Sequence, residues 1–197
     1  MSGIYKPGML RTVAGRQAAY AAVSAQPSLQ RANASALREL LMLLVKLAAI
    51  VATLLIIFTF LFGIVRYQEP SMSPAIKDGD LVIFYRNNHY GYHSQDVVAL
   101  AFQGRTHVRR VVATAGDWVD IIDGGLLVNG APQQESGVYQ KTERYQEGVD
   151  FPLMVPEGEV FVLGDSRIGS TDSRIYSCVR IQDTLGKVIA VIRRRGI

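Results

Sequence analysis

Ser71 stands where a nucleophile could act, in the segment EPSMSPAIKDGDLV (69–82) that follows a long apolar run. A serine hydroxyl attacks a carbonyl only when a nearby base removes its proton and hydrogen-bond donors hold the oxyanion that forms. The chemistry that this residue could carry is therefore acyl transfer. A serine beside prolines is also a common turn residue, so Ser71 alone does not decide between the two roles.

The segment HVRRVVATAGDWVDI (107–121) contains an imidazole and two guanidinium groups, which differ in whether they can act as a base. His107 titrates in the right range, whereas the guanidinium of Arg109 keeps its proton and cannot be a base. On a strand these two side chains point to one face about 7 Å apart, so His107 reaches the nucleophile only if the strand shifts or bulges. A packed or exposed strand histidine is the alternative. Lys77, in KDGD, is expected to be a solvated turn residue.

A third polar group stands near the C-terminus, in GDSRIGSTDSRIYSCVRIQDTLGKV (164–188). Asp172 and Arg174 are two residues apart, so on an extended segment both side chains point to the same side and can pair. We expect this pair to support the structure without taking part in chemistry. A solvated charge pair on a loop is the alternative for the segment taken alone.

The composition argues against several kinds of site. Cys178 is the only cysteine, so the chain can form neither an intramolecular disulfide nor a cysteine-based zinc site. His89 and His93 would share a face only on a helix, and the Asn and Gly residues around them predict a loop. The net charge is +4, but the basic residues are scattered and form no stripe. We therefore expect no metal site and no nucleic-acid partner.

The elements that would position these residues begin with an uncharged stretch, LAAIVATLLIIFTFLFGIV (47–65). As a helix it spans about 28 Å, close to the hydrocarbon thickness of a bilayer, which predicts a transmembrane anchor. A buried globular helix is the alternative, although the stretch has no polar face. A cleaved signal peptide has a shorter apolar core and ends in small residues, whereas Arg66 and Tyr67 follow here.

Charge predicts the direction of this anchor. Before the stretch stand Lys6, Arg11, Arg16, Arg31, Arg38 and Lys46, with Glu39 as the single acidic residue. The positive-inside rule therefore places residues 1–34 in the cytoplasm and residues 67–197 outside the membrane. Residues 1–34 show no strong periodicity and are interpreted as loosely ordered. Residues 35–66 are expected to form one helix, with Ser35 as its N-cap.

The outer part is expected to be mainly β, a barrel or folded sheet, because short β-rich runs alternate with Gly and Asp turn residues. Asp123-Gly124-Gly125 and Asn129-Gly130 are hairpin signals. Residues 133–155 give no clear pattern and are interpreted as an insertion over the barrel. The expected strands are 80–85, 96–102, 107–116, 118–122, 126–130, 159–164 and 185–195.

The three polar segments, in this order behind an anchor, resemble the type I signal peptidases, the membrane-bound serine peptidases that remove signal peptides from exported proteins. The resemblance covers most of the chain from about residue 47 onward. It implies a β-rich catalytic domain on one N-terminal anchor, with a hydrophobic face resting on membrane lipid. It also implies precursor proteins with signal peptides as partners, and no cofactor.

The same resemblance implies roles for single residues. Ser71 takes the place of the nucleophile, and its backbone N–H would be one oxyanion donor. Met72 matches a residue that helps to shape a pocket for small side chains. Ser170 matches the serine that orients the base, and Asp172 and Arg174 match a pair that braces the site.

Two positions depart from this family's pattern. Bacterial members use a lysine as the general base, and Arg109 occupies that position here. Glu69 stands where relatives tend to carry Gly or Ser, and a carboxylate pointing inward there would repel a developing oxyanion. An ion pair between Glu69 and Arg109 is one expected arrangement. Eukaryotic signal peptidases have a histidine in place of the lysine, which keeps His107 open as an unusual base.

Two functional hypotheses follow, both for a single-pass membrane protein of a Gram-positive bacterium. The first is an active signal peptidase that cuts after small residues and uses an unusual base. The second is a relative without proteolytic activity that assists the assembly of surface proteins such as pili. A membrane-anchored adhesin without any site is a third, weaker alternative, because the three segments in order would then be coincidence.

Overall fold

The computed structural model describes residues 9–86 and 91–193, with side chains from residue 35 onward. His89 lies outside the described residues. The chain divides into two compact units, Met1–Ile56 and Ile57–Ile197. The first is purely helical where it is described, and the second contains both β-sheets.

Helix α1 (Met9–Leu61) is longer at its start and shorter at its end than expected. It begins well before Ser35, so the interpretation of residues 1–34 as loosely ordered is wrong from Met9 onward, and Ser35 is not an N-cap. Ala, Leu, Gln and Arg, which are frequent between residues 9 and 34, are good helix formers. Ser35–Leu61 is long and apolar enough to cross a membrane.

The end of the apolar stretch is a strand rather than a helix. β1 (Phe62–Arg66) pairs antiparallel with β2 (Leu81–Tyr85), with Ile64 opposite Ile83. Aromatic and β-branched residues are good strand formers, and the pairing with β2 satisfies the backbone that a membrane helix would have satisfied internally. The expected helix over 35–66 therefore ends at Leu61.

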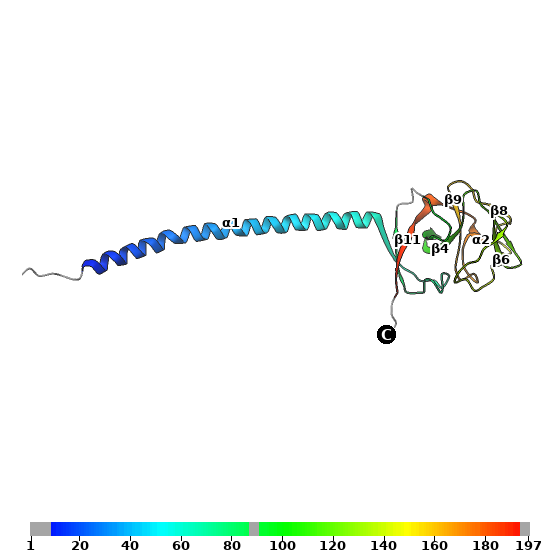
Figure 1. The fold of residues 1–197 in the computed structure, drawn as a ribbon, viewed down its shortest axis with the longest axis horizontal. Helices are drawn as coiled ribbons and strands as arrows, with labels where there is room; N and C mark the ends of the chain where they lie inside the picture. Colours follow the sequence, from blue (N-terminus) through cyan, green and yellow to red (C-terminus); the bar gives the residue numbers. More distant parts are fainter. Residues whose placement is uncertain (1–8, 87–90, 194–197) are drawn as a thin grey trace, which may run out of the picture. The chain divides into compact units, whose positions relative to one another are not determined.

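The β-rich unit contains two antiparallel sheets. The larger has the order β1-β2-β11-β3-β4-β9-β10, and the smaller has the order β7-β6-β5-β8. In Figure 1, β11 and β4 lie toward one end of this unit and β6 and β8 toward the other. The remaining bounds are β3 (Val97–Phe102), β4 (Arg105–Thr114), β5 (Trp118–Ile122), β6 (Gly125–Val128), β7 (Ala131–Pro132), β8 (Leu153–Met154), β9 (Glu159–Leu163), β10 (Val179–Arg180) and β11 (Thr184–Ile192), with a 3-10 turn at Ile181–Asp183.

The mainly β architecture and the seven expected strands are confirmed as elements, within a few residues at their ends, and residues 194 and 195 of the last expected strand lie outside the described residues. Both hairpin signals are confirmed as well. Asp123 and Gly124 join β5 to β6 with φ of 52° and 78°, and Asn129 and Gly130 join β6 to β7 with φ of 54° and 75°. Two consecutive residues with positive φ are what a tight hairpin with the right-handed strand twist requires.

Residues 133–152 form an irregular segment that is anchored to the rest of the unit by hydrogen bonds. The Thr142 N–H donates to the Gly124 carbonyl over 2.9 Å, and the Val149 N–H donates to the Arg174 carbonyl over 3.0 Å. The guanidinium of Arg167, which is 1% exposed, binds Thr142 and Glu135. This segment therefore holds the C-terminal polar segment in place.

Candidate active site

Ser71 lies in the loop between β1 and β2, and backbone hydrogen bonds fix its position. The base of the loop is closed by Tyr67 N–H to the Asp80 carbonyl and by Gly79 N–H to the Tyr67 carbonyl, both over 2.8 Å. The carbonyl of Ser71 accepts from the Ser166 N–H over 2.9 Å. The first and third polar segments of the sequence thus meet at the nucleophile candidate.

The hydroxyl of Ser71 has two hydrogen-bond partners. It donates to Glu69 Oε2 over 2.8 Å and lies 2.8 Å from the Tyr67 hydroxyl. Ser71 is 6% exposed. Among the described residues no acceptor is found for its backbone N–H. A donor beside the nucleophile is therefore available for a substrate oxygen.

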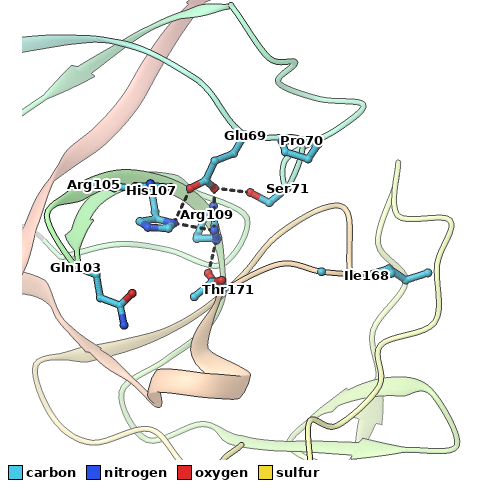
Figure 2. Close-up of a pocket in the computed structure, with 10 residues that line it drawn as sticks. Glu69, Pro70, Ser71, Gln103, Arg105, His107, Arg109, Ile168 and Thr171 are labelled. Carbon is cyan, nitrogen blue, oxygen red and sulfur yellow. Dashed lines mark hydrogen bonds and ion pairs between the residues drawn. The ribbon is translucent and has the colours of Figure 1, made fainter.

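Glu69 connects Ser71 to strand β4. Its Oε1 lies 2.9 Å from His107 Nδ1, and its Oε2 accepts from Arg109 Nη2 over 3.0 Å. Figure 2 shows the carboxylate between Ser71 on one side and His107 and Arg109 on the other. The expected ion pair between Glu69 and Arg109 is confirmed, and the carboxylate points inward.

Arg109 is 1% exposed, and backbone carbonyls accept hydrogen bonds from two of its three nitrogens. Nε donates to the Thr171 carbonyl over 2.9 Å, and Nη1 donates to the Val108 carbonyl over 2.6 Å. Ser170 was expected to hydrogen-bond to this position, but its buried hydroxyl has no hydrogen-bond partner among the described residues. A guanidinium has no free electron pair to accept a proton, so Arg109 is a fixed cation here.

His107 does not contact Ser71 through any hydrogen bond of the described residues. Its Nδ1 is 2.9 Å from both Glu69 Oε1 and Arg109 Nη2, and the residue is 7% exposed. The sequence predicts that His107 lies too far along the strand to reach Ser71 directly. In the structure Glu69 contacts both residues, and the strand does not need to shift. His107 can donate to Glu69 or accept from Arg109 through this nitrogen, but it cannot do both at once.

The charges of this cluster set its ionisation. Burial raises the pKa of the Glu69 carboxyl, but Arg109 and the Ser71 hydrogen bond outweigh it and hold the pKa below its usual value. Burial lowers the pKa of His107; the Glu69 charge opposes this, and Arg109 adds to it. Burial also raises the pKa of Tyr67. At neutral pH the cluster thus combines a carboxylate, a guanidinium and a neutral imidazole.

A pocket of about 550 Å³ opens over this cluster. Gln103 and Ile168 stand at its edges in Figure 2. Met72 is fully buried in a core cluster with Tyr67 and Val108 and is not among the lining residues. The lining comprises Glu69, Pro70, Ser71, Gln103, Arg105, His107, Arg109, Ile168, Gly169 and Thr171.

The pairing of Asp172 and Arg174 is confirmed, at 2.9 Å between Oδ2 and Nη2, but its geometry is not that of an extended segment. Asp172 is the N-cap of the short helix α2 (Ser173–Tyr176), and its side chain accepts from the Arg174 N–H. Its Oδ2 also accepts from the Gly164 N–H over 3.2 Å. This buried pair supports the backbone of the third polar segment next to Ser71.

Arg110 ties the second and third polar segments together, a contact that the sequence analysis missed. Its Nε and Nη2 bind the two carboxylate oxygens of Asp165 over 2.8 and 2.6 Å. Next to it, a Cβ on Gly164 would lie 2.3 Å from Ser170 Oγ and 2.6 Å from the Ser71 carbonyl oxygen. The only residue that fits position 164 without displacing Ser71 is therefore glycine.

The family described as "Signal peptidase, peptidase S26" matches residues 37–193, which is most of the chain. The chain belongs to this signal peptidase family. Signal peptidase IB of Staphylococcus aureus is 30% identical over 170 residues, which cover 77% of this chain and 88% of that protein. The resemblance seen in the sequence is thereby confirmed.

Two further signal peptidase relatives match different shares of this chain and of their own length. Thylakoidal processing peptidase 1 of Arabidopsis thaliana is 33% identical over 62% of this chain, and the match spans 32% of that longer protein. A crystal structure of a signal peptidase I from Enterococcus faecalis is 27% identical, covers 51% of this chain and 97% of that chain, and has a TM-score of 0.42.

The described residues of this family member contain no group of three His, Cys, Asp or Glu side chains that could hold a metal ion. The polar side chains that line the pocket instead end in a carboxylate, an imidazole, two guanidinium groups, the amide of Gln103 and the hydroxyls of Ser71 and Thr171. This set is suited to proton transfer and to the binding of a carbonyl oxygen.

Proposed function

We propose that this protein is a membrane-bound serine endopeptidase that removes N-terminal signal peptides from exported precursors after small residues, with Ser71 as the nucleophile. The observation that carries the proposal is the hydrogen bond of 2.8 Å from the Ser71 hydroxyl to a carboxylate inside an open pocket. The Ser71 N–H, which has no acceptor among the described residues, can bind the oxyanion that attack on a peptide carbonyl creates. Family membership supports the same reaction.

The anchor supports a place at the membrane for this reaction. Ser35–Leu61 is apolar enough to cross a bilayer, and the excess of basic residues before it favours a cytoplasmic N-terminus. Residues 67–197 would then act outside the cell membrane of a Gram-positive bacterium, where precursor proteins emerge next to membrane lipid.

The test is cleavage of a labelled precursor that carries an Ala-x-Ala site, by the full chain in detergent. We expect a single cut after the second alanine and its complete loss in Ser71→Ala, because the variant lacks the hydroxyl that would form the ester with the substrate. A known signal peptidase serves as the positive control for the precursor. Cleavage that persists in a folded Ser71→Ala variant, or no cleavage by the unaltered chain, refutes the proposal.

A second candidate function is favoured by one observation. Arg109, at the position of the family's lysine, is held by backbone carbonyls and by Glu69, which is an arrangement suited to support rather than to proton transfer. Such a protein would assist the assembly of surface proteins such as pili without cutting them. Surface assembly that is fully restored by Ser71→Ala in a deletion strain would favour this function over proteolysis.

A further inference from the structure

We infer that Glu69 is the general base that takes the proton of Ser71, and that His107 and Arg109 position its carboxylate. The inference rests on the proposed function, since it names the group that would drive that reaction. It assigns a catalytic role to the residue that stands two positions before the nucleophile, and it gives the arginine at the family's lysine position a positioning role.

Geometry leaves one acceptor for the proton. Among the described residues, the Ser71 hydroxyl has hydrogen bonds only with Glu69 and Tyr67. Tyr67 is buried and keeps its phenolic proton, so it donates to Ser71 Oγ rather than taking a proton from it. A base must lie within hydrogen-bond reach of the proton that it removes, and Glu69 Oε2 does so at 2.8 Å.

The carboxylate is oriented from its other side, as a base needs to be. His107 Nδ1 at 2.9 Å from Oε1 and Arg109 Nη2 at 3.0 Å from Oε2 both come from strand β4, whose position β3 and β9 fix by pairing on either side. The order nucleophile, base, orienting group is the same as in other activated serines. The carboxylate of Glu69 remains 24% exposed toward the pocket, where a substrate would lie.

The proton balance is complete without any further group. As Ser71 Oγ bonds to the scissile carbonyl carbon, its proton moves to Glu69 Oε2 and the carbonyl electrons move to the oxygen, which the Ser71 N–H binds. Glu69 then gives the proton to the leaving amine as the C–N bond breaks. A water molecule hydrolyses the resulting ester by the same proton path, and Ser71 is regenerated.

This order of proton transfers also removes the repulsion that was expected between the Glu69 carboxylate and an oxyanion. Glu69 becomes neutral at the moment when the oxyanion becomes negative, so the two charges never coexist. Arg109 stays positive beside Glu69 and stabilises its carboxylate before and after the proton transfer. An uncharged residue at position 69 would leave the buried guanidinium without its counterion.

The first experiment compares Glu69→Gln with the unaltered chain in the cleavage assay. Glutamine keeps the shape and accepts a hydrogen bond but cannot take the proton, so we expect a loss of about 10²- to 10⁴-fold in kcat. Glu69→Asp is expected to retain more activity than Glu69→Gln. Glu157→Gln, at an exposed position outside the pocket, is the matched control and is expected to leave the rate unchanged. Cleavage by Glu69→Gln at the rate of the unaltered chain overturns the inference while the proposed function stands.

A pH profile separates a base from a mere structural support. The groups that interact with Glu69 are Arg109, His107, Ser71, Tyr67 and Tyr176, and Arg105 lines the same pocket. With a carboxylate as the base, kcat/KM should be flat at neutral pH and should fall only as the pH drops below about 4.5, the ordinary value of a glutamic acid. A rate that rises through neutral pH would indicate an imidazole or amine base and would overturn the inference.

A second reaction keeps the inference testable if no precursor is cut. The full chain is treated with p-nitrophenyl acetate, and the acetyl group on Ser71 is followed by intact mass. Acetylation that is lost in Ser71→Ala and falls at least 10²-fold in Glu69→Gln supports the base even if the proposed function fails. Equal acetylation in the unaltered chain and Glu69→Gln, or none in either, overturns it.

Discussion

Arg109 and Glu69 form an ion pair of 3.0 Å in which the guanidinium is almost fully buried and the carboxylate faces the nucleophile candidate. Two departures from the family pattern, at positions 40 residues apart in the sequence, are therefore one structural feature. Removing the charge at either position alone leaves the other residue without its partner, which has consequences for how the site can be altered.

The pair predicts that a lysine base can be restored only by changing both positions. In Arg109→Lys the new ammonium would still pair with Glu69 and stay protonated, so we expect activity within about tenfold of the unaltered chain. In Glu69→Ser the base is lost. The double variant Glu69→Ser, Arg109→Lys removes the carboxylate and places an amine near Ser71, as in the family's bacterial members.

The measurement is cleavage of the labelled precursor between pH 5 and 9 by both single variants and the double variant. The double variant is expected to recover activity that Glu69→Ser lacks, with a rate that rises at higher pH because an amine must lose its proton. A double variant that folds but stays as inactive as Glu69→Ser would show that position 109 does not present an amine to Ser71.

Much of the fold follows from local patterns in the sequence. The apolar run predicts the helix, and both hairpins follow from Asp-Gly and Asn-Gly pairs that tolerate positive φ. The run 47–65 misleads at its end, because hydropathy does not distinguish a membrane helix from strand β1, whose partner β2 lies about 20 residues further on. Strands of two residues, such as β7 and β10, carry too few side chains to form a pattern.

The sequence predicts which residues form the site, but not all the hydrogen bonds between them. The sequence identifies Ser71, His107 and Arg109, and it anticipates the pairing of Glu69 with Arg109. It does not reveal that one carboxylate also joins Ser71 to His107, because this depends on how the loop 67–80 lies over β4. The pair Arg110–Asp165 was missed for the same reason, since its partners are 55 residues apart.

The buried guanidinium predicts a large loss of stability when it is removed. Arg109→Met leaves Glu69 and two backbone carbonyls without their donor, so we expect the free energy of unfolding to fall by about 3 kcal/mol. The matched control is Arg180→Ala, which breaks the pair with Asp183 at side chains that are 60% and 48% exposed. Such a surface pair contributes about 0 to 1 kcal/mol.

Thermal unfolding of the full chain in detergent measures both changes. Arg109→Met should lower Tm by several degrees more than Arg180→Ala does. Equal values for the two variants would mean that the Arg109 pair contributes no more than a surface pair, and the positioning role of Arg109 would then have no energetic basis.

His107 predicts how stability changes with pH. Its folded pKa lies below 6.5, mainly because of burial, so between these two values the unfolded chain binds more protons than the folded chain. Stability is therefore fully present above pH 6.5 and is lost as the pH falls toward the folded pKa. His107→Gln removes this contribution, and Tm measured at pH 7.5, 6.0 and 5.0 should fall less in the variant than in the unaltered chain.

The control is His93→Gln, which should keep the pH dependence of the unaltered chain because the histidine side chain is 85% exposed. If His107→Gln also keeps it, the pKa of His107 does not differ between the folded and the unfolded chain, and its surroundings do not hold the imidazole neutral. A Tm that falls more in His107→Gln than in the unaltered chain would instead mean that the pair with Glu69 keeps the proton on His107.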